Sequence, residues 1–205
     1  MERRNFLTAA SLLASFTLLP KEVFGQDKAA LHGADPLKPV LLPALPPLDH
    51  KGGMDIRVWM RSGLTNGLFS SVECAVAPKI MGPPPHYHQE LDELMLVLEG
   101  TASVMVEGEV VEIGAGGWHL RPRHLTHTFW NGSDQPLRFM DMYFNQPFEE
   151  FLEKVFFEYT PEKGYPFGSK ERDTVMNQLN QQFGLVYAST ANEERQAIIK
   201  KYGLK

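Results

Sequence analysis

Gly82-Pro83-Pro84-Pro85-His86-Tyr87-His88-Gln89-Glu90-Leu91-Asp92-Glu93 is the stretch of this 205-residue chain that decides its fold. His86 and His88 are two residues apart, and residues i and i+2 of a strand point to the same face. Two imidazoles would therefore project side by side. A tight turn through residues 89–92 would bring the carboxylate of Glu93 back beside them.

His127, from a later segment, completes a candidate metal site with His86, His88 and Glu93. A lone histidine is more simply interpreted as a core or surface residue. Three buried histidines and a glutamate without a metal, however, would leave costly unpaired polar groups. Three nitrogens and one carboxylate oxygen suit a single divalent transition metal: Mn, Fe, Co, Ni, Cu or Zn.

Residues 54–146 read as a series of short strands separated by Gly, Pro, Asn and Asp. This spacing predicts an all-β sandwich or barrel. The run Leu94–Leu98 is apolar on both faces, so we expect a second sheet or a second subunit to cover its outer face. The expected strands are 55–60, 67–76, 93–98, 101–106, 109–113, 118–121, 126–130 and 137–144.

Residues 147–205 change to a helical period and predict a C-terminal helical extension. Apolar residues recur at helical spacing over 148–156, after Pro147, and over 175–183. The third helix would begin at a capping box, Thr190-Ala191-Asn192-Glu193, and end at Gly203. We expect the aromatic residues of these helices to pack against the barrel.

Two motifs in this region resemble those of the cupin superfamily. They are His86-x-His88-x4-Glu93-x6-Gly100 and Gly116-x5-Pro122-x-His124-x2-His127-x3-Asn131. The resemblance implies an all-β double-stranded β-helix, or jelly-roll barrel, with the metal bound by the four residues named above. His124 stands where the family has a glycine, at a turn that often needs a positive φ, and histidine is among the residues that tolerate it. Ile80 replaces another family glycine.

The chain as a whole is similar to single-domain cupins of the quercetinase-like dioxygenase group. That similarity implies a metal-dependent oxygenase acting on a small phenolic or enolisable substrate, with Glu93 as both ligand and catalytic base. Phe129 shares a face with His127 and is expected to line the pocket. A non-catalytic cupin that binds a small ligand or holds a structural metal remains the alternative, because fold does not imply function.

The N-terminus reads as an export signal over residues 1–25. Arg3-Arg4, followed by Phe6-Leu7 and a short apolar stretch, resembles the twin-arginine signal of bacteria. It implies export machinery as a partner, a periplasmic or otherwise exported location, and no stable membrane anchoring after the signal is removed. Residues 26–53 hold five prolines and predict an extended arm.

Charge and cysteine content exclude other classes of protein. Twenty Lys and Arg against 25 Asp and Glu give a formal net charge of −5, and there is no basic run, which argues against nucleic-acid binding. Cys74, the single cysteine, cannot form an intramolecular disulfide and is expected to pack as a small apolar residue.

The apolar outer face of Leu94–Leu98 predicts a homodimer.

Overall fold

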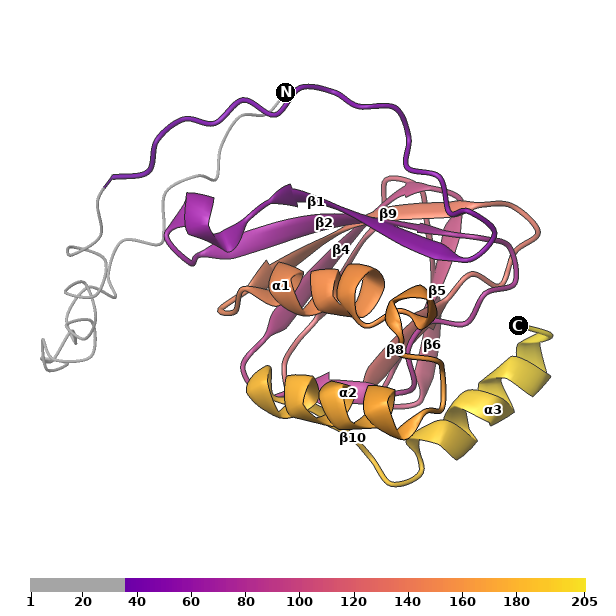
Figure 1. Cartoon of the computed structure of the whole chain (residues 1–205). Helices are drawn as coiled ribbons and strands as arrows, with labels where there is room; N and C mark the ends of the chain where they lie inside the picture. Colours follow the sequence, from indigo (N-terminus) through magenta and orange to yellow (C-terminus); the bar gives the residue numbers. More distant parts are fainter. Residues whose placement is uncertain (1–35) are drawn as a thin grey trace, which may run out of the picture. The chain divides into compact units, whose positions relative to one another are not determined.

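The computed structural model describes residues 36–205 (Figure 1). The expected export signal and the first part of the proline-rich arm lie outside the described residues. Ten strands form two five-stranded antiparallel sheets in the described part of the chain. This arrangement, with helices following the last long strand, confirms the predicted jelly roll.

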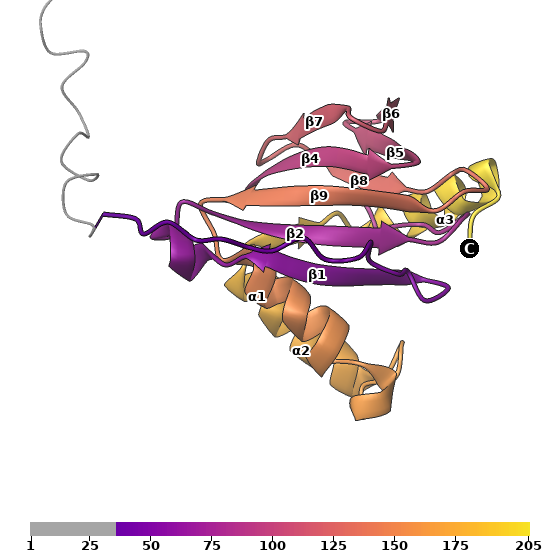
Figure 2. The same cartoon turned by 90° about the horizontal axis from the view of Figure 1, so that it is seen from above.

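Sheet A has the strand order β1-β2-β9-β4-β7, and its strands lie side by side in Figure 2. Their bounds are β1 Met54–Met60, β2 Phe69–Val76, β9 Leu137–Phe144, β4 Asp92–Glu99 and β7 Trp118–Arg121. A 3-10 turn, η1 (Ser62–Thr65), joins β1 to β2.

Sheet B has the order β10-β3-β8-β5-β6. Its strands are β10 Leu185–Tyr187, β3 His86–His88, β8 His127–Trp130, β5 Thr101–Val106 and β6 Glu109–Gly114. β3 and β4 are close in sequence but belong to different sheets, so the turn between them carries the chain from one wall of the barrel to the other.

The core lies between the two sheets because apolar residues alternate along their strands. Met95 and Val97 of β4 are fully buried, whereas Leu94 and Leu96, which alternate with them, are only half-buried. The ring of Phe129 in sheet B meets Phe139 of sheet A edge-on, with centroids 5.1 Å apart. Cys74 is buried in the same core, as its sequence context indicated.

The C-terminal helices pack on the barrel as expected. α1 (Phe148–Glu153) runs into a π-helical turn, η2 (Lys154–Glu158), and a 3-10 turn, η3 (Pro161–Lys163), follows. α1 contacts β2, whereas α2 (Lys170–Gln182) contacts β10, so the two helices close one side of the barrel (Figure 1). Phe148 stacks on Phe151 at 4.7 Å, and Phe183 meets both rings edge-on.

α3 (Ala191–Tyr202) begins where the sequence predicted, but the expected capping box is absent. Thr190 has helical dihedral angles, φ −92° and ψ −1°, so its side chain is not placed as that of an extended N-cap residue. Its hydroxyl instead donates to Glu194 Oε1 at 2.7 Å. The helix is held by packing, with the Tyr202 ring 4.9 Å from that of Trp130.

Three motif residues shape the turns around the site. His124 has φ +66°, which confirms the expected positive φ, and its N–H donates to His88 O. Gly100, also at positive φ, faces the carbonyl of Pro136, which a Cβ would strike. Asn131 is fully buried, and its amide donates to the carbonyls of Val76, Ala77 and Gln135.

Candidate metal centre

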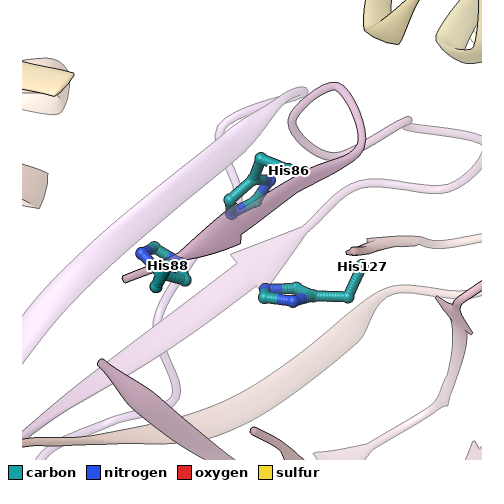
Figure 3. A group of neighbouring side chains, drawn as sticks. All are labelled: His86, His88 and His127. Carbon is teal, nitrogen blue, oxygen red and sulfur yellow. The ribbon is translucent and has the colours of Figure 1, made fainter. Parts of the chain in front are cut away.

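Three buried histidines meet inside the barrel (Figure 3). His86 and His88 project from the same face of β3, and His127 on the neighbouring β8 stands directly opposite His86 in the strand register. One ligand nitrogen from each lies within 4.8 Å of those of the other two. Three such nitrogens can surround one metal ion.

Backbone carbonyls set the orientation of two of the rings. His86 Nδ1 lies 2.9 Å from Pro84 O, and His127 Nδ1 lies 2.9 Å from Leu125 O. A carbonyl oxygen only accepts, so Nδ1 carries the hydrogen in each ring and Nε2 keeps a free lone pair. This is the tautomer that a metal bound through Nε2 requires.

Three buried ring nitrogens of these histidines make no hydrogen bond. His127 Nε2 and both ring nitrogens of His88 are buried without a hydrogen bond. Burial, together with the neighbouring His127 and His88, lowers the pKa of His86 to about 3, so this ring is neutral at ordinary pH. Convergent buried imidazoles fit a divalent metal, because coordination would satisfy nitrogens that are otherwise costly to bury.

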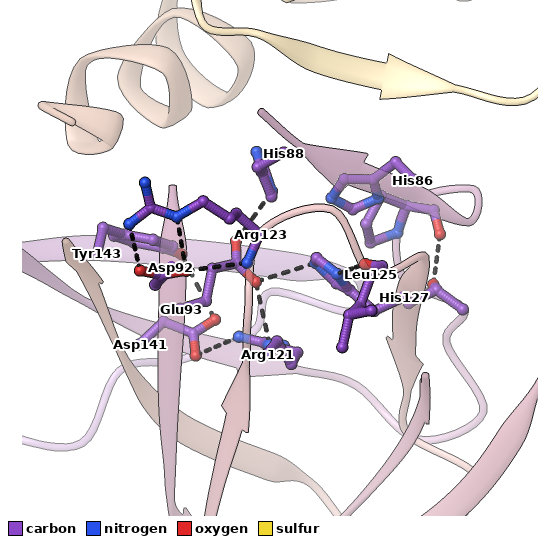
Figure 4. Close-up of polar contacts among 12 residues, drawn as sticks. His86, His88, Asp92, Glu93, Arg121, Arg123, Leu125, His127, Asp141 and Tyr143 are labelled. Atoms are coloured by element: carbon purple, nitrogen blue, oxygen red, sulfur yellow. Dashed lines mark hydrogen bonds and ion pairs between the residues drawn. The ribbon is translucent and has the colours of Figure 1, made fainter. Parts of the chain in front are cut away.

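Glu93 approaches the histidines from the facing sheet (Figure 4). Its Oε1 lies 3.2 Å from His88 Nε2, and its Oε2 lies 3.1 Å from His127 Nε2. Burial opposes ionisation of Glu93, but Arg121 and His127 hold its pKa well below the usual value. The structure therefore brings all four predicted residues together, although Glu93 is nearer to His88 and His127 and is not part of the three-histidine cluster.

A buried ion-pair network, not predicted from the sequence, lies behind Glu93. Arg121 Nε lies 3.0 Å from Glu93 Oε2, and Arg121 Nη2 lies 2.6 Å from Asp141 Oδ1. Tyr143 OH donates to Asp141 Oδ2 at 3.5 Å. The alternation of β9 could have revealed Asp141, because it falls on the inward face with Leu137 and Phe139.

A cavity of about 260 Å³ opens beside these residues. Its polar end holds His86, His127, Glu93 and Arg121, and Phe129 lines its wall, as the sequence predicted. Tyr87 projects to the other face of β3, away from the histidines. The helical side of the cavity is entirely apolar: Phe148, Phe151, Leu152, Val155, Phe156 and Met176.

Residues 72–143 match the family model of the cupin domain, and this range includes every residue of the three-histidine cluster and of the ion-pair network. This part of the barrel, from β2 to β9, is therefore similar to cupin domains. No curated protein matches the sequence.

Solved cupin-fold structures resemble the chain remotely. KdgF from Halomonas sp. is 18% identical with a TM-score of 0.44, over 50% of this chain and 88% of that one. An RmlC-like cupin from Shewanella frigidimarina is 19% identical with a TM-score of 0.41, over 50% and 85% of the two chains. Similarity at this level does not indicate the activity of this chain.

Proposed function

We propose that this cupin is a metal-dependent oxygenase, of the quercetinase-like dioxygenase kind, acting on a small phenolic or enolisable substrate. The observation that carries the proposal is the apolar cavity that ends on buried histidines and a glutamate. A volume of about 260 Å³ lies just below the range of ~300–1,000 Å³ usual for ligand pockets, which favours a small ligand.

The residues at the polar end and at the apolar end of the cavity would have different roles. His86, His88 and His127 would hold the metal, which would supply Lewis-acid and redox chemistry towards dioxygen. The ionised carboxylate of Glu93 is placed to accept the proton of a substrate hydroxyl group beside the histidines. The rings of Phe148 and Phe151 would orient the apolar part of the substrate and exclude water.

The test is elemental analysis of the purified protein, followed by oxygen uptake with a panel of phenols and 1,3-diketones. We expect about one equivalent of a divalent transition metal and oxygen consumption with at least one member of the panel. Glu93→Gln should abolish uptake, whereas Tyr87→Phe, outside the cavity, should leave it unchanged. A protein that holds metal and binds panel members without consuming oxygen would contradict the proposal.

The alternative is a cupin that binds a small ligand, or holds a structural metal, without turnover. A structural metal centre favours a closed site filled by protein side chains. Here the open cavity next to the histidines favours access by a small molecule. Tight binding without oxygen uptake in the same experiment would identify the ligand-binding alternative.

We also propose that the protein is exported through the twin-arginine route. Arg3-Arg4 and the apolar stretch after them support this proposal, and both lie outside the described residues. Among residues 36–205, no helix combines the length and the apolar character that a membrane crossing needs. Recovery of a chain lacking the first ~25 residues from the periplasm would support export; a full-length cytoplasmic chain would contradict it.

The outer face of sheet A supports a homodimer. Pro46 O accepts from Arg57 Nη1, and Leu48 N–H donates to Glu73, so the arm is anchored over β1 and β2. The middle of this face, on β9, β4 and β7, is apolar: Met140, Met142, Leu94, Leu96, Trp118 and Leu120. Arg138, paired with Glu73 and Glu99, lies at its border.

A second copy of the chain is the occupant that we propose for this apolar face. Trp118 and Leu120 are 55% and 56% exposed, and Leu41 in the arm is 90% exposed. One chain thus offers two exposed apolar surfaces. One is the arm around Leu41, and the other is the apolar part of sheet A, which adjoins the part that the arm covers. A two-fold pair can bury both kinds of surface at once.

A further inference from the structure

Arg121 occupies an unusual position for a charged residue. It ends β7, an edge strand, yet only 1% of its surface is exposed. Glu93 is its cross-strand neighbour, and Asp141 lies on the next inward position of sheet A. Asp141 contacts Arg121, Arg121 contacts Glu93, and Glu93 contacts the histidines (Figure 4).

Stability does not explain this network. Desolvating an ion pair costs so much that apolar residues of similar volume often stabilise a core equally well or better. The network also leaves an excess negative charge, because two carboxylates face one guanidinium. A role in arranging the site explains its presence better.

The contacts of Glu93 indicate how Arg121 can orient its carboxylate. Glu93 Oε2 lies 3.0 Å from Arg121 Nε, in an ion pair rather than an aligned hydrogen bond. Both carboxylate oxygens also face a histidine: Oε1 lies 3.2 Å from His88 Nε2, and Oε2 lies 3.1 Å from His127 Nε2. Arg121 thus holds the carboxylate in the rotation at which each oxygen faces one histidine, whereas an unanchored carboxylate could turn away from them.

We propose that Arg121, itself held by Asp141, is a positioning residue that engages Glu93 Oε2 and fixes the rotation of the carboxylate beside His88 and His127. The inference rests on the proposed function, because it concerns the same site. A guanidinium can reach both carboxylates with two different nitrogens, and an ammonium group cannot reproduce this geometry. Arg121→Lys therefore keeps the charge and loses the arrangement.

The probe is Co²⁺ added to the metal-free, full-length protein, followed by its visible absorption bands and by its dissociation constant. Residues that support metal ligands typically change metal affinity ~10–100-fold when they are replaced. We expect Arg121→Lys to weaken Co²⁺ binding by a factor in that range and to shift the absorption bands. Tyr87→Phe, on the opposite face of β3 from the histidines, should do neither.

A double-mutant cycle separates positioning from a general effect on the fold. If Arg121 acts through Glu93, the Arg121→Lys/Glu93→Gln protein binds Co²⁺ no more weakly than Glu93→Gln alone. Additive losses would overturn the proposal, as would an unchanged affinity in Glu93→Gln. If Arg121→Lys does not fold, Asp141→Asn loosens Arg121 without replacing it, and the same cycle with Glu93→Gln decides the question.

The cycle also distinguishes this inference from the proposed function. A wild-type protein that binds no Co²⁺ contradicts the metal centre itself. A wild-type protein that binds Co²⁺ with additive mutant effects leaves the centre intact and refutes only the role of Arg121.

Discussion

His86 lies directly opposite His127 across the β3–β8 pair, with the two ring centroids 4.7 Å apart. Each ring is held through Nδ1 by the carbonyl of the residue two positions before it. The two histidines thus use the same local device on adjacent strands, and His88 is placed beside them by the period of β3. Backbone geometry therefore places the three imidazoles of the candidate metal centre.

The aromatic wall of the cavity should carry much of the stability of the helical extension. Phe148 is buried and contacts His88, Tyr143, Phe151 and Phe183. We expect Phe148→Ala to lower the free energy of unfolding by about 3–5 kcal/mol, measured by urea denaturation. Phe167→Ala, at a ring that is 77% exposed, should cost less than about 1 kcal/mol. Similar losses in both variants would mean that α1 is not packed as described.

The turn at His124 should tolerate side chains according to their backbone preference. His124 has φ +66°, a region that β-branched residues avoid. We expect His124→Val to destabilise the protein by about 1–3 kcal/mol, whereas His124→Asn should be nearly neutral. The measurement is thermal unfolding monitored by circular dichroism. Equal melting temperatures for the two variants would contradict the strained turn.

Glu73 should make stability depend on pH in the acid range. Burial raises its pKa, but hydrogen bonds from Trp59 and Arg138 outweigh burial and lower it below the usual value of 4.5. The folded pKa lies below the unfolded one, so this stabilisation is complete above the unfolded pKa and is lost as pH falls through the folded pKa.

The comparison of wild type with Glu73→Gln tests that dependence. The melting temperatures should differ most at pH values above the unfolded pKa of Glu73 and converge towards the acid end. A difference that stays constant from neutral to strongly acid pH would show that the charge of Glu73 contributes nothing.

The apolar face of sheet A predicts the response of the assembly to a charge. Leu120→Glu would place a carboxylate in the apolar face, on its edge strand β7, next to Leu94, its cross-strand partner. We expect wild type to scatter light as a dimer at micromolar concentration and Leu120→Glu to scatter as a folded monomer. Val111→Glu, on β6 of the other sheet, is the matched control, because Val111 is also exposed but lies outside the face. A monomeric wild type would refute the dimer.

The sequence predicted most of the barrel because apolar and polar residues alternate along its long strands. It did not predict β10, since the three residues Leu185–Tyr187 are too few to show a period. That short strand matters, because it pairs with β3 and places Tyr187 beside His86, with centroids 5.6 Å apart.

The histidines could be found from sequence because their spacing on a strand and their motif agree. Arg121 could not, because its role depends on a partner brought close by strand pairing between β4 and β7. A charged residue at the end of an edge strand is ordinarily expected in solvent. Its burial depends on the facing carboxylates, which the three-dimensional fold alone brings together.

The most direct test of the metal centre is the metal content of purified wild type, His127→Ala and His124→Asn, measured by mass spectrometry. We expect about one equivalent of a divalent transition metal in wild type and in His124→Asn, and most of it lost from His127→Ala, because a nitrogen that would bind the metal is removed. Circular dichroism should show that all three proteins are folded. An unchanged metal content in folded His127→Ala would contradict the assignment of this histidine as a ligand, and with it the centre described here.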